Sequence, residues 1–371
     1  MMARPAAGGQ RQLAVIYAVL AAVFYGISVP VSKLLLNGVS PVFLAALLYL
    51  GAGIGMIVVN FLRRGTAKTK EARITRQELP FTAAMVVLDI AAPILLMFGL
   101  SLSSPATVSL LGNFEIVATA VVALVVFKEA VGKRMWVAIV LITLSSLLLS
   151  VADFASLRFS LGALLVLLGC LCWGIENNCT RMLSLKDPVE IVIIKGLGAG
   201  CGSLLIAAIT GGLSIAGGFS ASLTFIGFSL LLGFLAYGLS IYLYIMAQRN
   251  LGATRTSVFF AFSPFIGTLL SLLVFRERPT LAFILALAVM LAGAYFAVFE
   301  RHGHEHEHEY MEHDHCHSHD DGHHNHVHEP PVVGEHCHMH VHEPMTHSHP
   351  HAPDLHHVHS HKAIEVEVKH E

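Results

Sequence analysis

Residues 41–62 read PVFLAALLYLGAGIGMIVVNFL, and residues 188–209 read PVEIVIIKGLGAGCGSLLIAAI. Each stretch is almost wholly apolar and has the length of about 20 residues that one helix needs to cross a bilayer. Both begin with Pro-Val and both carry Gly-Ala-Gly-x-Gly near the middle, at an offset of 147 residues. The pair therefore predicts a membrane protein that contains a duplicated helical unit.

The rest of the chain has the same character up to about residue 300. The sequence is 55% hydrophobic and 13% charged, with a mean hydropathy of +0.67, whereas soluble globular proteins have about 25% charged residues. We predict an all-α polytopic membrane protein whose first partner is the lipid bilayer. The ten expected spans are 13–36, 41–62, 79–100, 104–127, 133–151, 161–184, 188–210, 223–247, 254–275 and 280–299.

Further matches between the two halves extend the duplication. Tyr25-Gly26 aligns with Trp173-Gly174, and the run from Val126 to Glu129 aligns with the run from Val274 to Glu277. Shared apolar composition does not explain several matches at a nearly constant offset. We therefore expect two repeats of five spans each.

The repeats are predicted to occupy residues 13–151 and 161–299, after a short N-terminal segment of residues 1–12. Five is an odd number of spans, so the repeats must lie in opposite orientations in the membrane. Inverted repeats of this kind are typical of secondary transporters, which bind substrate near the midplane between the repeats.

The basic residues predict the orientation of the chain. With the N-terminus in the cytoplasm, 16 Lys and Arg residues fall in cytoplasmic segments and 4 fall in outer ones. This bias favours that orientation, in the plasma (inner) membrane, with both termini inside. Because the basic residues lie between apolar spans, we do not expect nucleic acid as a partner.

The sequence resembles the EamA family of ten-span carriers in the drug/metabolite transporter superfamily. The resemblance covers residues 13–299 and rests on the duplicated unit, on Trp173-Gly174, and on the endings Phe127-Lys128-Glu129 and Phe275-Arg276-Glu277. It implies secondary active export of small metabolites by alternating access, and it leaves the substrate undefined. A second copy of the chain is a further candidate partner.

Ionisable side chains inside predicted spans are the candidate site, because burying a charge in the membrane is costly and usually serves function. We expect them to line a central cavity, where a carboxylate can exchange a proton during transport. The alternative is a buried ion pair that only fixes helix packing. The candidates for the substrate cavity or for ion coupling are Asp89, Glu115, Glu176, Asn177, Asn178 and Lys195.

A tail of different chemistry follows, over residues 300–371. All 24 histidines of the chain lie between His302 and His370, interleaved with Asp and Glu, and the apolar content is too low for a core, so we expect disorder. No cofactor is required, but imidazole and carboxylate suit divalent Zn, Ni or Co. The candidate metal ligands are His304, His306, His308, His313, His315, His317, His319, His336, Cys337, His338, His340 and His342.

The membrane body contains no histidine. The only candidate metal ligands that share one helix face there are Cys172, Glu176 and Cys179, spaced i, i+4, i+7. Small apolar filling is the more common use of such cysteines.

Three functions stay open at this point. The first is a metabolite exporter with proton coupling and a metal-binding tail. The second is a carrier of a divalent metal or metal chelate that is fed by the tail. The third is a membrane-anchored metal buffer or sensor that no longer transports. We expect no enzyme, because no catalytic motif occurs.

Overall fold

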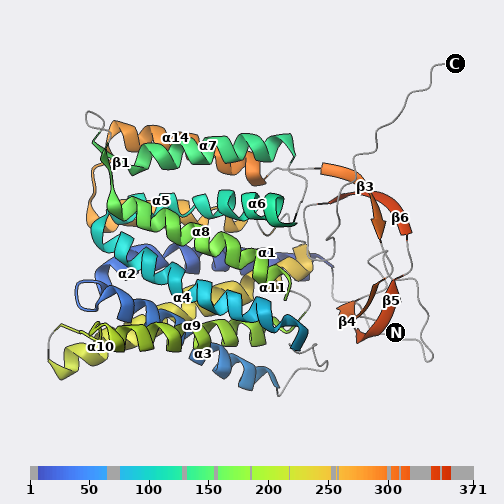
Figure 1. Ribbon diagram of the computed structural model, residues 1–371, viewed down its shortest axis with the longest axis horizontal. Helices are drawn as coiled ribbons and strands as arrows, with labels where there is room; N and C mark the ends of the chain where they lie inside the picture. The colour runs from blue at the N-terminus through green and yellow to red at the C-terminus, as the bar shows by residue number, and fades with distance from the viewer. Residues whose placement is uncertain are drawn as a thin grey trace.

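The protein is a bundle of long helices that run roughly parallel to one another (Figure 1). The computed structural model describes residues 7–64, 76–127, 132–153, 158–183, 186–216, 218–251, 256, 259–298, 302–308, 311–317, 336–342 and 345–351. The helices of the first half are α1 (Ala7–Gly26), α2 (Ser28–Leu35), α3 (Pro41–Arg64), the short 3₁₀ helix η1 (Arg76–Glu78), α4 (Leu79–Leu102), α5 (Pro105–Leu111), α6 (Phe114–Phe127) and α7 (Lys133–Ser150).

A two-stranded hairpin of β1 (Val151–Asp153) and β2 (Arg158–Phe159) joins the two halves. The helices of the second half are α8 (Leu161–Arg181), α9 (Pro188–Ile209), α10 (Phe219–Gly233), the π-helical segment η2 (Phe234–Leu239), α11 (Ser240–Leu251), α13 (Ser263–Phe275) and α14 (Leu281–Val298).

Helix ends follow local sequence signals. Proline stands at the first helical position of α3, α5 and α9, where its missing N–H costs nothing. The Asp187 carboxylate accepts a hydrogen bond of 2.9 Å from the Val189 backbone N–H and so caps α9. Ser104 caps α5 in the same way, by accepting from the Thr107 N–H.

The polytopic all-α membrane fold is confirmed. Within the described part of the chain, nine helices have the length and composition to cross a membrane, and Ser263–Phe275 is a shorter apolar helix. The predicted span 254–275 begins largely outside the described residues, so a count of ten stays a prediction. Two spans are broken near their middle: α1 and α2 meet at Ile27, and α5 and α6 meet at Gly112-Asn113.

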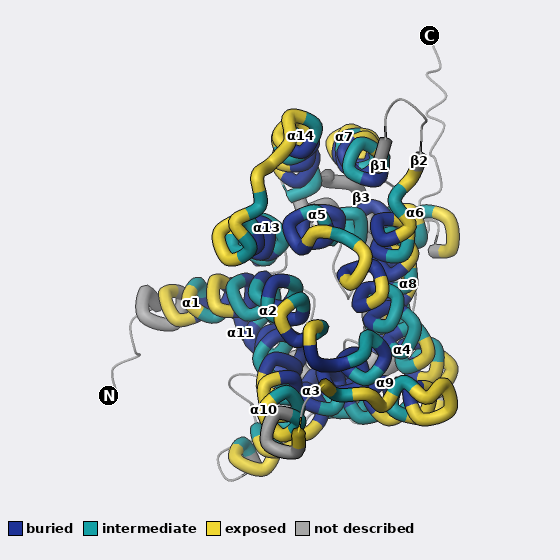
Figure 2. The backbone as a smooth tube through the Cα atoms, turned by 90° about the vertical axis from the view of Figure 1, so that its left-hand side faces the viewer, coloured by how far each residue is buried: buried dark blue, intermediate teal, exposed yellow. Residues whose placement is uncertain are grey.

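Helices from the two halves pack against each other rather than forming separate bundles. Helix α3 packs along α9, and α4 packs along α8. Seen along the helices, α2, α3, α4, α5 and α8 surround the middle of the bundle, and the pair α7 and α14 lies at one edge (Figure 2). The middle of the bundle is thus built from both repeats.

Glycine allows α3 and α9 to pack at backbone distance. A Cβ atom added to Gly53 would lie 2.7 Å from the Leu197 backbone nitrogen, and one added to Gly200 would lie 2.7 Å from the Leu50 backbone nitrogen. Real side chains do not approach so closely, so only glycine fits. The repeated glycine cluster therefore serves close helix packing.

Four strands are described in the tail: β3 (His302–His308), β4 (Met311–His317), β5 (His336–His342) and β6 (Met345–His351). Antiparallel pairing joins β3 to β6 and β4 to β5, with the backbone of His315 opposite that of His338. This differs from the expectation of a tail without regular structure. Strict alternation of residue types suits paired strands, although ribbons of two strands are only marginally stable in water. The side chains of the predicted metal ligands, and His319 altogether, lie outside the described residues.

Candidate functional site

An ion-paired triad lies in the middle of the bundle. Lys195 on α9 places its Nζ atom 2.8 Å from Oε1 of Glu176 on α8 and 3.4 Å from Oδ2 of Asp89 on α4. The side chain of Asp89 is fully buried, and those of Glu176 and Lys195 are 2% and 12% exposed. One ammonium group therefore joins three helices and two carboxylates.

Asp89 is held by a second chain of hydrogen bonds. The Tyr49 hydroxyl donates to Asp89 Oδ1 over 2.9 Å, and the Trp173 indole N–H donates to the Tyr49 oxygen over 3.3 Å. Asp89 Oδ2 is buried and has no hydrogen-bond partner among the described residues apart from its ion pair with Lys195. Pro93 follows four residues later inside α4 and leaves the Asp89 carbonyl without its helical donor.

Glu115 belongs to a neighbouring polar group. It lies in the first turn of α6, where the helix dipole favours an anion. The Asn177 side-chain amide donates to Glu115 Oε1 over 2.7 Å and to the Thr119 hydroxyl over 3.3 Å. The Asn178 amide donates to the Thr119 carbonyl over 3.2 Å. Two consecutive asparagines of α8 thus hold α6 at the point where its span is broken.

The six candidate residues therefore come together in two adjacent groups. Lys195 joins Asp89 and Glu176 in the first group, while in the second Asn177 binds Glu115 and Asn178 binds the nearby α6 backbone. The ion pair that was the structural alternative does form. Of these residues only Lys195 also lines the pocket beside the triad, so a cavity-lining role for the others stays a prediction.

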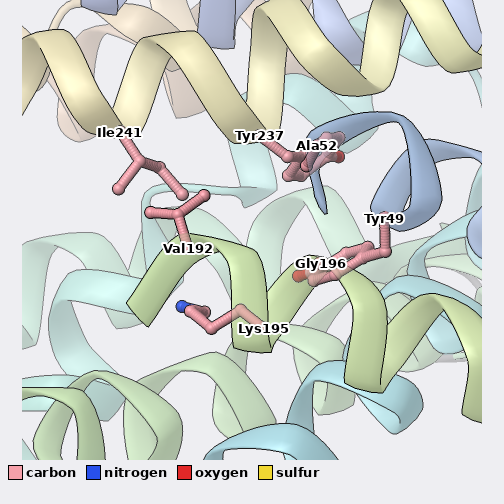
Figure 3. Close-up of a pocket in the computed structure, with 7 residues that line it drawn as sticks. All are labelled: Tyr49, Ala52, Val192, Lys195, Gly196, Tyr237 and Ile241. Atoms are coloured by element: carbon pink, nitrogen blue, oxygen red, sulfur yellow. The ribbon is translucent and has the colours of Figure 1, made fainter. Parts of the chain in front are cut away.

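That pocket is narrow and mostly apolar. Lys195 and Tyr49 line it from α9 and α3, and Tyr237 lines it from the π-helical segment η2 (Figure 3). The remaining lining residues are Ala52, Val192, Gly196 and Ile241. π-Helical segments inside α-helices frequently mark functional sites.

Aromatic residues around the pocket were not predicted. The rings of Tyr49 and Tyr237 stack with centroids 5.4 Å apart, and Tyr25 meets Tyr237 edge-on at 6.0 Å. Phe260 lies 5.2 Å from Tyr25 and 4.9 Å from Tyr244, measured between ring centroids. An aromatic residue in an apolar span does not by itself indicate a functional site, because such residues are common there. The alignment of Tyr25 with Trp173 was the one hint in the sequence.

The repeat offset shows that corresponding positions of the two repeats differ in chemistry. With an offset of 148 residues, Asp89 corresponds to Tyr237 and Glu176 corresponds to Ser28, and the Tyr237 and Ser28 side chains are hydrogen-bonded to each other. Glu115 corresponds to Ser263. Positions that carry acids in one repeat therefore carry neutral hydroxyl groups in the other.

No metal site is formed by the described side chains, since none of them make a group of three or more His, Cys, Asp and Glu residues suited to an ion. Cys172 and Cys179 are free thiols on α8, and they do not combine with Glu176 into such a group. The only metal ligands that stay predicted are those of the tail.

Comparison with known proteins agrees with this architecture. The chain is 26% identical over 294 residues to an uncharacterized transporter of Methanothermobacter thermautotrophicus, a match that covers 75% of this chain and 83% of the relative. A solved structure, described only as the crystal structure of a protein, is 18% identical and has a TM-score of 0.54. It covers 78% of this chain and 98% of its own, so the likeness concerns the fold. The model of the EamA-like transporter family matches residues 12–151 and 160–299. With two matched repeats that make up most of its length, the chain is an integral membrane protein of the EamA-like transporter family.

Proposed function

We propose that the protein exports small metabolites by secondary active transport, with protons as the coupling ion. The contact of Lys195 with both Asp89 and Glu176 is the observation that carries the proposal. The three residues lie between the repeats, where inverted-repeat carriers bind their cargo. Export is the direction that the family resemblance implies.

The chemistry of the triad suits coupling. Two carboxylates that share one ammonium leave the triad with an excess negative charge. A proton or a cationic group can therefore bind to one carboxylate while Lys195 stays paired with the other. When a buried, hydrogen-bonded group loses its charge, the interactions that hold its helices together change in strength. Because Lys195, Glu176 and Asp89 lie on three helices, a change of protonation acts on α9, α8 and α4 together.

Untargeted metabolite profiling tests the proposal without the substrate having to be identified first. Cells that express the full chain are compared with cells that express Glu176→Gln, by measuring metabolites in the medium and in the cytosol. Glu190→Gln is the matched control, because it removes a carboxylate from the first turn of α9, away from the triad. We expect at least one metabolite to leave cells with the parent chain and the control, but not with Glu176→Gln. Equal profiles for all three chains contradict the proposal.

Coupling is tested separately by collapsing the proton gradient in the same cells. Export that depends on Glu176 should then stop. Export that continues unchanged after the collapse contradicts proton coupling while leaving transport in place.

For the tail, we propose that it binds divalent Zn, Ni or Co on the cytoplasmic side and buffers the metal beside the carrier. The concentration of 24 histidines in residues 302–370 supports this role, because neutral imidazole is a common ligand of these metals. The pairing of β4 with β5 places the backbones of His313 and His340 opposite each other, and likewise those of His315 and His338.

Removal of the tail tests this part. We expect a chain truncated after Arg301 to bind far less zinc than the full chain while it keeps metabolite export. If the truncated chain and Glu176→Gln both change the cellular metal content, the carrier transports metal and the buffering role is wrong.

A further inference from the structure

The centre of the bundle holds more negative than positive charge. Among the described residues, the Lys195 ammonium is the one cation that contacts Asp89 and Glu176, and Glu115 lies close enough to feel the charges of Glu176 and Lys195. With every group ionised, the sum of three acids and one base is a net charge of −2. Uncompensated charge is costly inside a membrane, so the centre is built to accept positive charge.

Two of the carboxylates have capacity to bind another group. Asp89 is fully buried, and its Oδ2 atom shares the Lys195 ammonium, at 3.4 Å, with the closer Glu176 at 2.8 Å. Glu115 is paired with the neutral amide of Asn177. A buried carboxylate without a full positive partner is costly, and an ammonium group from a ligand would supply that charge.

Aromatic rings lie directly beside the acids, since the Tyr49 hydroxyl donates to Asp89 Oδ1. Tyr25 and Tyr237 lie within electrostatic range of Glu115, and Tyr49 stacks on Tyr237. Ring faces attract organic cations within about 6 Å of the ring centroid. The pocket next to these rings is lined mostly by apolar residues, such as Ala52, Val192 and Ile241, and by Lys195, whose charge the acids of the triad balance.

We infer that the cargo of this site is an organic cation, a protonated amine attached to an apolar or aromatic body. Its ammonium group pairs with Glu115 and Asp89, and its apolar part lies against Tyr25, Tyr49 and Tyr237. The inference rests on the proposed function, because it names the class of substrate that the same site carries.

Binding of a matched series of small probes tests the inference on the purified full chain in detergent. The probes are 2-phenylethylamine, the neutral 2-phenylethanol and the anionic phenylacetate, which share a phenyl ring and differ in charge. We expect saturable binding of the amine, and weaker or no binding of the other two. Phenylacetate or phenylethanol that binds as tightly as the amine overturns the inference.

Variants assign the binding to the site. Glu115→Gln keeps a partner for Asn177 and should weaken amine binding by at least about tenfold, because it removes a charge that pairs with the ligand. Glu190→Gln should leave amine binding unchanged. Tyr237→Phe should bind the amine and Tyr237→Leu should bind it more weakly, since only the first keeps an aromatic face. If Glu115→Gln does not fold, the comparison of Tyr237→Phe with Tyr237→Leu tests whether the amine binds at this site. Unchanged amine binding in both Glu115→Gln and Tyr237→Leu overturns the inference.

Failure of the inference is distinguishable from failure of the transport proposal. If profiling finds an exported metabolite that depends on Glu176 and is an anion, transport stands and the cationic substrate class is wrong. If the amine binds as expected and no metabolite is exported, the site is assigned correctly and transport is wrong.

Discussion

Lys195 and Glu176 form the shortest ion pair in the middle of the bundle, with 2.8 Å between Nζ and Oε1, and the same ammonium reaches Asp89 at 3.4 Å. The Thr180 hydroxyl also donates to Glu176 Oε1. Helices α4, α8 and α9 are therefore held by one cation.

Loss of that cation should destabilise the protein strongly. Lys195→Met leaves Asp89 and Glu176 buried without a positive partner, at a cost of about 3 kcal/mol or more. Thermal unfolding in detergent should show a clear fall in the midpoint. The double variant Lys195→Met with Asp89→Asn should recover part of the loss, because one uncompensated charge is gone. A double variant less stable than the single one would contradict the charge explanation.

Removal of the Tyr49 hydroxyl should have a smaller effect. Tyr49→Phe takes away the donor to Asp89 Oδ1 and the acceptor for the Trp173 indole, and leaving buried polar groups unpaired costs about 1–3 kcal/mol. Unfolding measured through tryptophan fluorescence should report the loss. Tyr17→Phe is the control and should match the parent chain, because the half-buried Tyr17 ring packs where α1 meets α11 and phenylalanine keeps that ring. Equal stability of Tyr49→Phe and the parent would mean that this hydrogen-bond chain is not needed.

Glycine at the contact of α3 with α9 should not tolerate a methyl group. A Cβ atom on Gly196 would meet the Tyr49 carbonyl at 2.9 Å and the backbone of Gly53 even more closely, so we expect Gly196→Ala to cost about 1–3 kcal/mol through overpacking. Gly227→Ala is the control, because nothing lies within 4 Å of its added Cβ. Alanine there should stabilise α10 by up to about 1 kcal/mol. Similar stability for the two variants would argue against close packing.

Metal binding by the tail should depend on pH in one direction. Histidine must be neutral to ligate a metal, and its ordinary pKa is about 6.5. Zinc bound by the full chain at neutral pH should therefore be released as the pH falls below about 6. Equilibrium dialysis over this range measures the release, with the chain truncated after Arg301 as the blank. Zinc that stays bound in acid would indicate a site without histidine.

Much of this architecture could be predicted from patterns along the chain. The apolar runs set the helices, and the match of residues 41–62 with 188–209 indicates a duplicated unit through residue order alone. Asp89, Glu176 and Lys195 could be selected because charged residues in apolar spans are rare. Which of them touch could not be predicted, because that depends on how α4, α8 and α9 rotate about their axes.

The aromatic residues around the pocket were beyond sequence reasoning for a different reason. Tyr49 and Tyr237 lie in apolar spans where a ring is ordinary lipid-facing or core material, and only tertiary packing turns the two rings toward each other. The π-helical turn at Phe234–Leu239 also has no signature in the residues. The residues of the ion pairs can be chosen from the sequence because their charges are visible there. The arrangement of the rings depends on backbone geometry, which the sequence does not show.

The two repeats contribute different charged residues to the centre of the bundle. Asp89 and Glu115 come from the first repeat, and Glu176 and Lys195 come from the second. Two copies of the first repeat would assemble acids without their lysine, and two copies of the second would lack Asp89 and Glu115. Neither repeat alone carries all four groups, so each half depends on the other for a complete centre.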